Sequence, residues 1–243
     1  YDFEYRYLYP PVINNAKMNE LVKNAAKKIP EVKNIIILKH PAMAGDDFSY
    51  FAQKVPSAYF KLGVGNDKIN FPIHSNRFTI DNSALLTGTK LMAQTATTEF
   101  VNDVISSGQI TSDNYQKFTT TLYSSGNTYD INLEVKILDE TTSKKVTDEN
   151  PTKIGNNSYY SLYTSQIIDK IGISSENGQI DNNRYGKMVL KQGDQVSVTV
   201  RNNNRTLSQA LKSIYYNITG NDVSIIAASS SGTIAINGMT GTT

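Results

Sequence analysis

The sequence predicts an α/β segment at the N-terminus, followed by an α+β module whose sheet is antiparallel. Two observations support this prediction. Up to about residue 90, apolar stretches with the period of a strand alternate with stretches of helical period, as in α/β folds. After about residue 100 the chain becomes rich in Asn, Ser and Thr, and its strand patterns alternate between apolar and polar residues, as in a sheet with one solvated face.

The N-terminal segment is expected to run strand, helix, strand, helix, strand. Three stretches have the apolar pattern of strands: residues 1–9, 32–40 and 58–65. Asn14 or Asn15 can cap a helix that extends to about Ile29, because apolar residues recur there at spacings of three and four. A shorter helix is expected within residues 46–55.

A long helix is expected to begin at Asp81 or Ser83 and to end at Gly108. Its apolar stripe has spacings of seven and four residues and comprises Leu85, Met92, Ala96, Phe100 and Val104. This stripe crosses the change in composition without a break. We therefore place the junction of two domains, residues 1–92 and 93–243, inside or beside this helix.

The second domain is expected to hold both helices and an antiparallel sheet. Ser112 can cap a helix that carries Tyr115, Phe118 and Leu122. Strict alternation predicts strands at residues 131–137 and 195–200, the second with three valines facing inward. Residues 158–171 are ambiguous between a helix and a strand. A helix is expected at residues 206–220, and a closing hairpin at residues 222–236.

Composition excludes several classes of function. The 24 Lys+Arg and 22 Asp+Glu are spread along the chain without a basic cluster, so nucleic acid is not an expected partner. Cysteine is absent, which excludes disulfides, thiolate metal sites and cysteine nucleophiles. No apolar run approaches the roughly 20 residues that span a bilayer. A cytosolic protein and a thiol-free bacterial surface protein both fit this composition.

His40 and His74 are the only two histidines. Zinc takes three or four protein ligands, and neither histidine belongs to an H-x-x-x-H or H-x-D cluster. The neighbouring carboxylates of Asp46 and Asp47 precede a helix, where acids commonly cap the first turn. The residue pattern alone therefore favours a structural role for His74.

Three blocks occur in the order YRYLYPPVINN, HPAMAGDDFSYFAQKVPSAYFKLGVGN and PIHSNRFTIDNSALLTGTKLMA. They resemble the C-terminal part of the zinc-dependent amidohydrolase and aminoacylase family, which includes N-acyl-amino-acid deacetylases. The resemblance covers about residues 3–98 and implies a partial amidohydrolase catalytic domain. It implies that His74 is a ligand of a dinuclear metal centre. It also implies that four residues line the substrate side of the active-site wall: Asp46, Asp47, Ser49 and Tyr50.

The chain departs from this family in two ways. Asn76 stands where the family has proline, which is expected to loosen the turn after His74. The other metal ligands and the general base of the family lie upstream of the matched blocks. Zinc is therefore expected only if a partner chain supplies the remaining ligands, and the chain by itself is not expected to be a competent hydrolase.

Residues 93–243 resemble the ectodomain of pilin-like bacterial surface proteins. The resemblance lies in TATTEFVNDVISSGQITSDNYQKF, SSGNTYDINLEV and GDQVSVTVRNNNRTLSQALKSIYY. It implies assembly or surface display. A secreted or cell-surface location would suit this module, whereas a cytoplasmic location is typical of the first family.

Three functions remain open. The favoured one is a non-catalytic composite of an incomplete zinc amidohydrolase segment and a surface-exposed binding module. The alternatives are half of a metal-dependent amidohydrolase acting on N-acyl amino acids, completed by another chain, and a structural pilus-like protein. In each case, unpaired sheet edges of the first domain are expected to be covered by the second domain, by self-assembly or by a partner chain.

Overall fold

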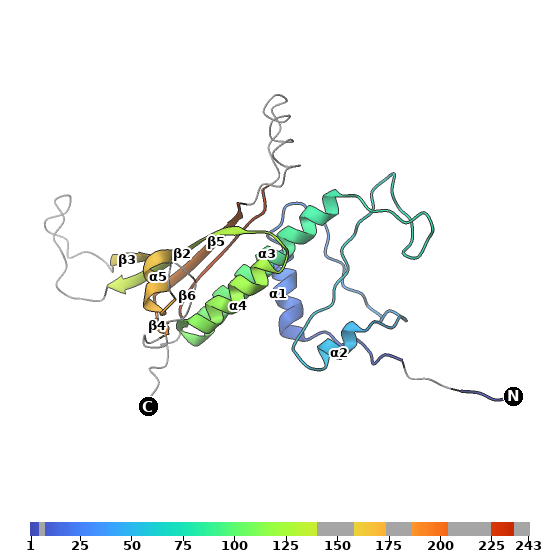
Figure 1. Ribbon diagram of the computed structural model, residues 1–243, viewed down its shortest axis with the longest axis horizontal. Helices are drawn as coiled ribbons and strands as arrows, with labels where there is room; N and C mark the ends of the chain where they lie inside the picture. The colour runs from blue at the N-terminus through green and yellow to red at the C-terminus, as the bar shows by residue number, and fades with distance from the viewer. Residues whose placement is uncertain (5–7, 140–157, 174–185, 204–224, 236–243) are drawn as a thin grey trace, which may run out of the picture. The chain divides into compact units, whose positions relative to one another are not determined.

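The computed structural model describes residues 1–4, 8–139, 158–173, 186–203 and 225–235 (Figure 1). The chain forms two compact units, Tyr1–Thr95 and Ala96–Thr243. The boundary between them falls within one continuous helix, α3 (Ser83–Ser107). No helix of the described residues is long and apolar enough to cross a membrane.

The first unit is built on helix α1 (Ala16–Ala26), which begins where the sequence predicts. The Oδ1 atom of Asn15 accepts a hydrogen bond from the backbone N–H of Met18 at 3.2 Å and so caps the first turn. The small core of this unit consists of Ala25, Ala26, Ile29 and Leu91, with Val32 packed against it. Its short helix, α2 (Phe48–Ala52), also lies in the predicted stretch.

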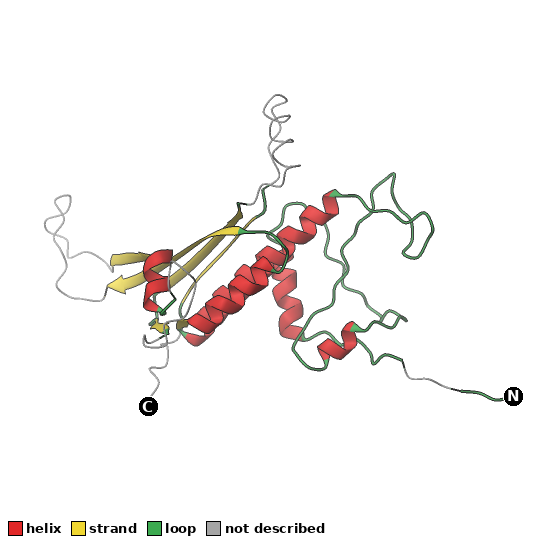
Figure 2. Ribbon diagram, viewed as in Figure 1, coloured by secondary structure: helices red, strands yellow, loops and turns green. Residues whose placement is uncertain are grey.

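The three strands predicted for the first unit are absent from its described residues. Residues 1–4, 8–9, 32–40 and 58–65 follow loop paths in Figure 2. A strand exists only when a neighbour completes its ladder of hydrogen bonds, and no neighbouring strand is available within this unit. The three predicted strands are therefore not confirmed among the described residues of the first unit, and the strands of the mixed α/β structure, which are antiparallel, lie in the second unit.

Helix α3 has the predicted bounds, but its buried face shifts along its length. Asp81 accepts a hydrogen bond from the N–H of Ser83 at 2.9 Å, and the helix ends before Gly108, whose φ is 65°. Ala96, Phe100 and Val104 of the predicted stripe are buried. The two earlier members, Leu85 and Met92, are exposed, because the neighbouring Leu91 packs against α1 instead.

A four-stranded antiparallel sheet is the centre of the second unit. Its order is β3 (Ser158–Tyr163), β2 (Tyr129–Asp139), β5 (Gln195–Asn202) and β6 (Ala227–Thr233). The predicted inward valines Val196, Val198 and Val200 are buried, as are Leu133 and Val135 opposite them. Strands β1 (Gln109–Thr111) and β4 (Lys187–Val189) form a separate antiparallel pair.

Helix α4 (Ser112–Tyr123) packs against the second half of α3 through aromatic rings. Phe100 stacks on Phe118 with 4.8 Å between ring centroids, and Tyr115 meets both rings edge-on. Burial raises the pKa of Tyr115 to about 12. The cap of α4 is Thr111 rather than the predicted Ser112, because Thr111 and Asn114 exchange two hydrogen bonds in a reciprocal capping box.

The stretch that was ambiguous between helix and strand contains both. Strand β3 pairs with β2 only from Glu134 onward, and helix α5 (Thr164–Lys170) follows at once. The hydroxyl of Thr164 lies 2.8 Å from the backbone nitrogen of Leu133, where it accepts a hydrogen bond, and 3.3 Å from the carbonyl oxygen of Ile131. Where β3 ends, the Thr164 side chain thus supplies the hydrogen bonds that the backbone of a longer β3 would make to β2.

The C-terminal predictions are only partly covered by the described residues. The helix expected at residues 206–220 lies outside them. Of the closing hairpin, the structure describes one strand, β6, which pairs with β5 rather than with a strand of its own segment.

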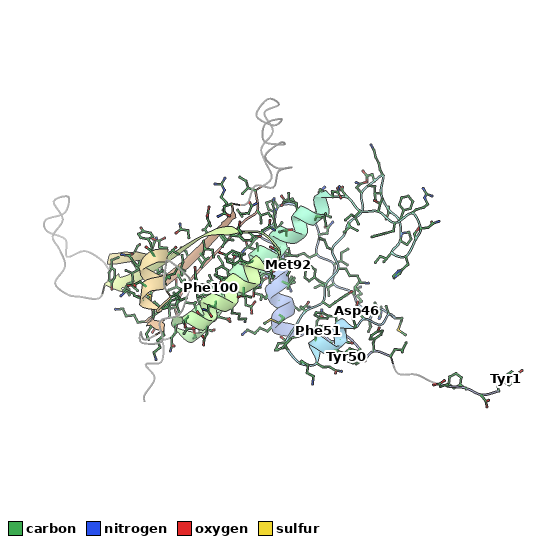
Figure 3. The ribbon with its side chains drawn as sticks, viewed as in Figure 1. Tyr1, Asp46, Tyr50, Phe51, Met92 and Phe100 are labelled. Carbon is green, nitrogen blue, oxygen red and sulfur yellow. The ribbon has the colours of Figure 1, made fainter. Side chains whose placement is uncertain are left out.

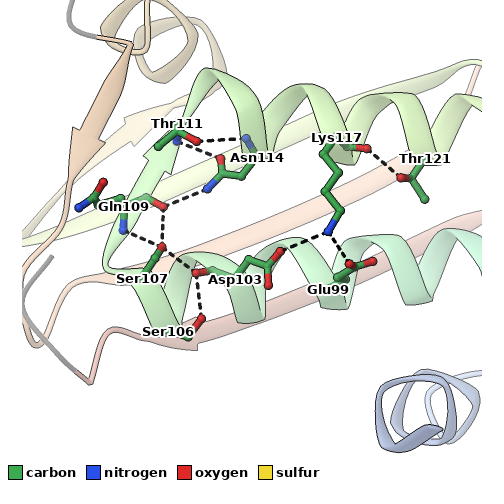
Figure 4. A network of polar contacts seen from close by, with 9 residues as sticks. All are labelled: Glu99, Asp103, Ser106, Ser107, Gln109, Thr111, Asn114, Lys117 and Thr121. Carbon is green, nitrogen blue, oxygen red and sulfur yellow. Dashed lines mark hydrogen bonds and ion pairs between the residues drawn. The ribbon is translucent and has the colours of Figure 1, made fainter. Parts of the chain in front are cut away.

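A polar network joins the two helices α3 and α4 (Figure 4). The ammonium of Lys117 lies 2.7 Å from Oε1 of Glu99 and 3.8 Å from Oδ2 of Asp103. The hydrogen bond to Glu99 is the main cause that raises the pKa of Lys117. The side chain of Lys117 is 61% exposed, so solvent screens these ion pairs and limits their contribution to stability.

The turn before β5 is held by a buried carboxylate. Asp194 is 1% exposed, and its two oxygens accept hydrogen bonds from the backbone N–H groups of Leu138 at 2.8 Å and Lys191 at 2.9 Å. Gly193 makes the turn possible with a φ of 95°, a conformation that residues with a Cβ rarely adopt. The carboxylate therefore links this turn to the end of β2.

Replacing Asp194 tests this link. Asp194→Ala removes the acceptor of two backbone N–H groups, so we expect the free energy of unfolding to fall by about 2–4 kcal/mol. Asp194→Asn keeps one acceptor oxygen and should lose about half as much. Urea unfolding followed by far-UV circular dichroism measures both, and a loss below about 0.5 kcal/mol for the alanine variant would contradict the assignment.

The contribution of Lys117 to the free energy of unfolding should depend on pH. Because folding raises the pKa of Lys117 above its ordinary value of 10.5, its contribution is complete below that pH and is lost as the pH rises through the folded value. We expect Lys117→Met to destabilise the protein by about 0.5 kcal/mol at pH 7, and the difference to vanish in strong alkali. Lys136→Met, on an exposed position of β2, is the control, and a Lys117 difference that grew with pH would contradict the prediction.

Candidate functional site

The two acids at the start of α2, Asp46 and Asp47, differ in their contacts. Oδ1 of Asp46 accepts the backbone N–H of Phe48 at 2.9 Å, and Oδ2 accepts the hydroxyl of Tyr59, also at 2.9 Å. These hydrogen bonds, the first above all, lower the pKa of Asp46, and the bond to Asp46 raises the pKa of Tyr59. Asp47 is exposed at the N-cap position and makes no capping hydrogen bond. Its carboxylate is available to solvent.

Tyr50 and Ser49 face different surroundings on α2. The hydroxyl of Tyr50 donates a hydrogen bond to the carbonyl of Leu8 at 2.8 Å, and its ring meets Tyr9 edge-on at 6.2 Å. Asp46, Tyr50 and Phe51 lie together around α2 in Figure 3. Ser49 is fully buried, and its hydroxyl has no hydrogen-bond partner. A buried hydroxyl without a hydrogen bond costs free energy of folding, so the side chain of Ser49 is expected to destabilise this helix.

A groove of about 610 Å³ lies beside α2. Its walls are parts of residues 11–16 and 49–56, and they include Ser49. Asn14 lines the groove, and its side-chain amide exchanges hydrogen bonds of 2.9 and 2.7 Å with the backbone of Tyr59, three residues beyond the second wall. Asn15 adds a backbone hydrogen bond to Ser57. The side-chain amide of Asn14 thus pairs with both backbone polar groups of Tyr59, as a neighbouring strand would.

His74 lies at the tip of a tight turn. The N–H of Ser75 donates to the carbonyl of Pro72 at 3.2 Å, and His74 has a φ of 69°, the only positive value among the non-glycine residues described. A second turn follows, closed by a hydrogen bond of 3.0 Å from Phe78 to Ser75. Asn76 occupies the position of that turn where proline is favoured. His74 itself is exposed.

The predicted site residues are not brought together as a metal centre. No hydrogen bond or ion pair of the described chain links His74 to Asp46, Asp47, Ser49 or Tyr50. Among the residues that the structure describes, no group of three or more His, Asp or Glu could hold a metal ion. A zinc ion needs three or four ligands, so the described residues do not form a zinc site by themselves.

Comparison with known proteins finds relatives for the N-terminal part of the chain. Residues 1–98 match the sequence model of peptidase family M20/M25/M40. A probable hydrolase of Synechocystis is 33% identical over 98 residues, which are 40% of this chain and 25% of that protein. An N-acetyldiaminopimelate deacetylase of Leuconostoc citreum is 40% identical over 80 residues, or 33% and 19% of the two chains. A thermostable carboxypeptidase of Saccharolobus solfataricus is 32% identical over 83 residues, or 33% and 20%.

The N-terminal part of the chain is therefore similar to M20-family hydrolases, with amidohydrolases and deacetylases among its relatives. The chain spans a quarter or less of the length of these relatives. No solved structure matches the chain. The resemblance of residues 93–243 to pilin-like modules finds no support in these comparisons and stays a prediction.

Two features of this region were not expected from the sequence. The first is the burial of the Ser49 hydroxyl without a partner, since a serine one residue inside a helix usually reaches solvent. The second is the clamp between Asn14 and Tyr59, which joins residues 45 positions apart. The sequence offered Asn14 and Asn15 as alternative caps, and the structure uses Asn15 as the cap and Asn14 as the clamp.

Removing the Ser49 hydroxyl should not weaken the first unit. Ser49→Ala deletes a buried oxygen that has no partner, so we expect the amides of α2 to exchange with solvent at the same rate or up to about fivefold more slowly, equal to about 1 kcal/mol. Ser57→Ala is the matched control, because its hydroxyl donates to the carbonyl of Val55 at 2.7 Å, and its loss should speed exchange. Faster exchange in Ser49→Ala would show that the hydroxyl has a stabilising contact.

Proposed function

We propose that residues 1–98 form the C-terminal part of a metal-dependent hydrolase that cleaves the amide bond of N-acyl amino acids. The rest of the catalytic unit is supplied by polypeptide outside these 243 residues. His74 contributes one ligand to its metal centre, and the other ligands come from the completing polypeptide.

The similarity of residues 1–98 to M20-family hydrolases is the observation that carries this proposal. The names of the relatives point to hydrolysis of amide or peptide bonds, and two of the N-acetyldiaminopimelate deacetylases match with 40% and 34% identity. The chain accounts for only a fifth of each of these two proteins. A fifth of an enzyme supplies a part of an active site, so we assign the remaining groups to polypeptide outside these 243 residues.

The conformation of His74 supports its role. A left-handed backbone costs a residue with a Cβ about 1 kcal/mol or more, and such strain persists where the surroundings or a function maintain it. Here the imidazole is exposed at the tip of the turn from Pro72 to Ser75, so a second polypeptide can reach it. A histidine retained only for packing would be expected to be buried.

The carboxylates of α2 fit the substrate side of such an enzyme. Asp46 is held by Phe48 and Tyr59, which fixes the start of the helix, whereas Asp47 remains exposed beside it. An exposed acid at the start of a helix can interact with a cationic group of an amino-acid substrate. We therefore propose Asp46 as the positioning residue and Asp47 as the substrate-facing one.

The other two functions have less support. The comparisons favour a hydrolase segment over a non-catalytic composite, and they add nothing for a pilus-like protein. For the second unit, the antiparallel sheet and its helices define a fold class and do not favour one function over another.

A chimera tests the proposal. Residues 1–98 replace the matching stretch of the Leuconostoc citreum deacetylase, which restores a full-length polypeptide around His74. We expect the chimera to release acetate from N-acetyldiaminopimelate in the presence of zinc. His74→Ala in the chimera should lower the rate by about 100-fold or more, because a metal contributes several kcal/mol to such reactions, and bound zinc should fall as well.

The control for this variant is His40→Ala, which removes the other histidine from an exposed loop and should leave rate and zinc content unchanged. A chimera that unfolds cooperatively but neither hydrolyses the substrate nor binds zinc would refute the proposal. Zinc-dependent hydrolysis by the isolated 243-residue chain would refute the part that requires a second polypeptide.

A further inference from the structure

Residues 35–38 are the most apolar exposed stretch of the first unit. Their sequence is Ile-Ile-Ile-Leu, and the four side chains are 41%, 81%, 71% and 65% exposed. Lys33 and Lys39 flank the stretch on either side. Single exposed apolar residues are common on proteins, but four consecutive ones mark a surface that is covered when the protein functions.

The backbone of this stretch is also unpartnered. Among the described residues, none of the N–H or C=O groups of residues 35–38 makes a hydrogen bond to another backbone group. Residues 35–38 belong to no helix, strand or turn. Because backbone polar groups are almost always paired when they are buried, covering the four side chains also requires hydrogen-bond partners for their backbone.

The pattern of side chains specifies the kind of cover. Successive residues of a strand point to opposite faces, so a run of four apolar residues presents an apolar surface on both. Strands that are apolar on both faces occur in the middle of sheets that are covered on both sides. Three β-branched isoleucines in succession also favour an extended conformation.

We propose that residues 35–38 are a docking strand, which inserts into a sheet of the polypeptide that completes the hydrolase. This inference rests on the proposed function and names the contact through which residues 1–98 join the rest of the hydrolase. The docking strand supplies main-chain hydrogen bonds for affinity, and its isoleucines fill apolar pockets on both faces of the sheet.

Two observations indicate what covers the docking strand: the numbers of exposed and buried apolar residues in each unit, and the comparisons with known proteins. In the first unit 19 large apolar side chains are exposed and only seven apolar residues are buried, whereas the second unit has six exposed and 22 buried among its described residues. The second unit thus has a core of its own. The first is similar to a quarter or less of the length of its hydrolase relatives, so the remainder of such a hydrolase is the cover that its apolar residues fit.

Binding in trans tests the docking strand. The full 243-residue chain is mixed with Leuconostoc citreum deacetylase from which the 19% that matches this chain has been deleted. All solutions contain EDTA, so that a metal centre plays no part. We expect a one-to-one complex by sedimentation velocity, with exchange of the amides of residues 35–38 slowed at least 100-fold relative to the free chain.

Substitutions on the two faces separate a docking strand from a general apolar patch. Ile36→Lys and Ile37→Lys point to opposite faces, and each should weaken the complex at least tenfold, because each removes the burial of a whole isoleucine. Tyr160→Lys replaces a large exposed side chain, 54% exposed, in β3 of the second unit and should leave the affinity unchanged. If only one of the two isoleucine variants weakened the complex, the segment would be covered on one face and the proposal would be wrong.

Other outcomes would identify a different occupant. Protection of residues 35–38 in the free monomeric chain would assign the cover to the chain itself, and protection in a concentration-dependent dimer would assign it to a second copy. If the shortened deacetylase is insoluble alone, the covalent chimera gives the decisive measurement. Residues 35–38 should be protected there, and fast exchange in a folded chimera would overturn the proposal.

The two proposals can fail separately. An active chimera whose residues 35–38 exchange rapidly would leave the hydrolase function standing and remove the docking strand. A complex in EDTA with protected residues 35–38, together with a chimera that is folded but inactive with zinc, would leave the docking strand and remove the proposed function.

Discussion

Every extended segment needs hydrogen-bond partners on its backbone, and this requirement separates the two units of the chain. In the second unit β2 lies between β3 and β5, so its ladder is completed on both sides. In the first unit the segments with strand composition have no such neighbours among the described residues. They stay as loops, and their apolar side chains remain in solvent. The compactness of each unit follows from whether its strands find partners within the chain.

The helices and the central strands could be predicted from the sequence because their determinants are local. Asn15 and Asp81 act as caps through atoms two or three residues away, and the alternation of β2 and β5 reflects one buried face. The strands expected before residue 66 depend on partner strands that the described residues of the first unit do not supply. Their apolar composition is typical of strands, but a strand also needs a neighbouring strand to complete its hydrogen bonds, and the described residues of the first unit contain none. The capping residue of α4 was missed by one position, because Thr111 and Ser112 can both cap and only the reciprocal bond with Asn114 distinguishes them.

The site could be predicted from the sequence only as a set of residues. Resemblance pointed to His74 and to the acids before α2, whereas the residue pattern alone favoured a structural histidine. Neither indicated that His74 would stand exposed with a left-handed backbone, since this depends on the turn from Pro72 to Ser75. Nor could the spacing of residues show that Asp46 accepts hydrogen bonds from Phe48 and Tyr59, whereas Asp47 makes no capping hydrogen bond. Such details depend on which loops lie beside α2.

The hydroxyl of Thr164 has a consequence for how the sheet of the second unit aligns. It bonds to the backbone of β2 at the point where β3 stops, so it marks one end of the contact between these strands. If β3 slid by one residue along β2, this hydroxyl would lose the N–H of Leu133, and Tyr160 and Leu162 would exchange faces with their neighbours. A single threonine thus acts as a lock against sliding, in a strand whose serines and tyrosines would otherwise tolerate more than one alignment.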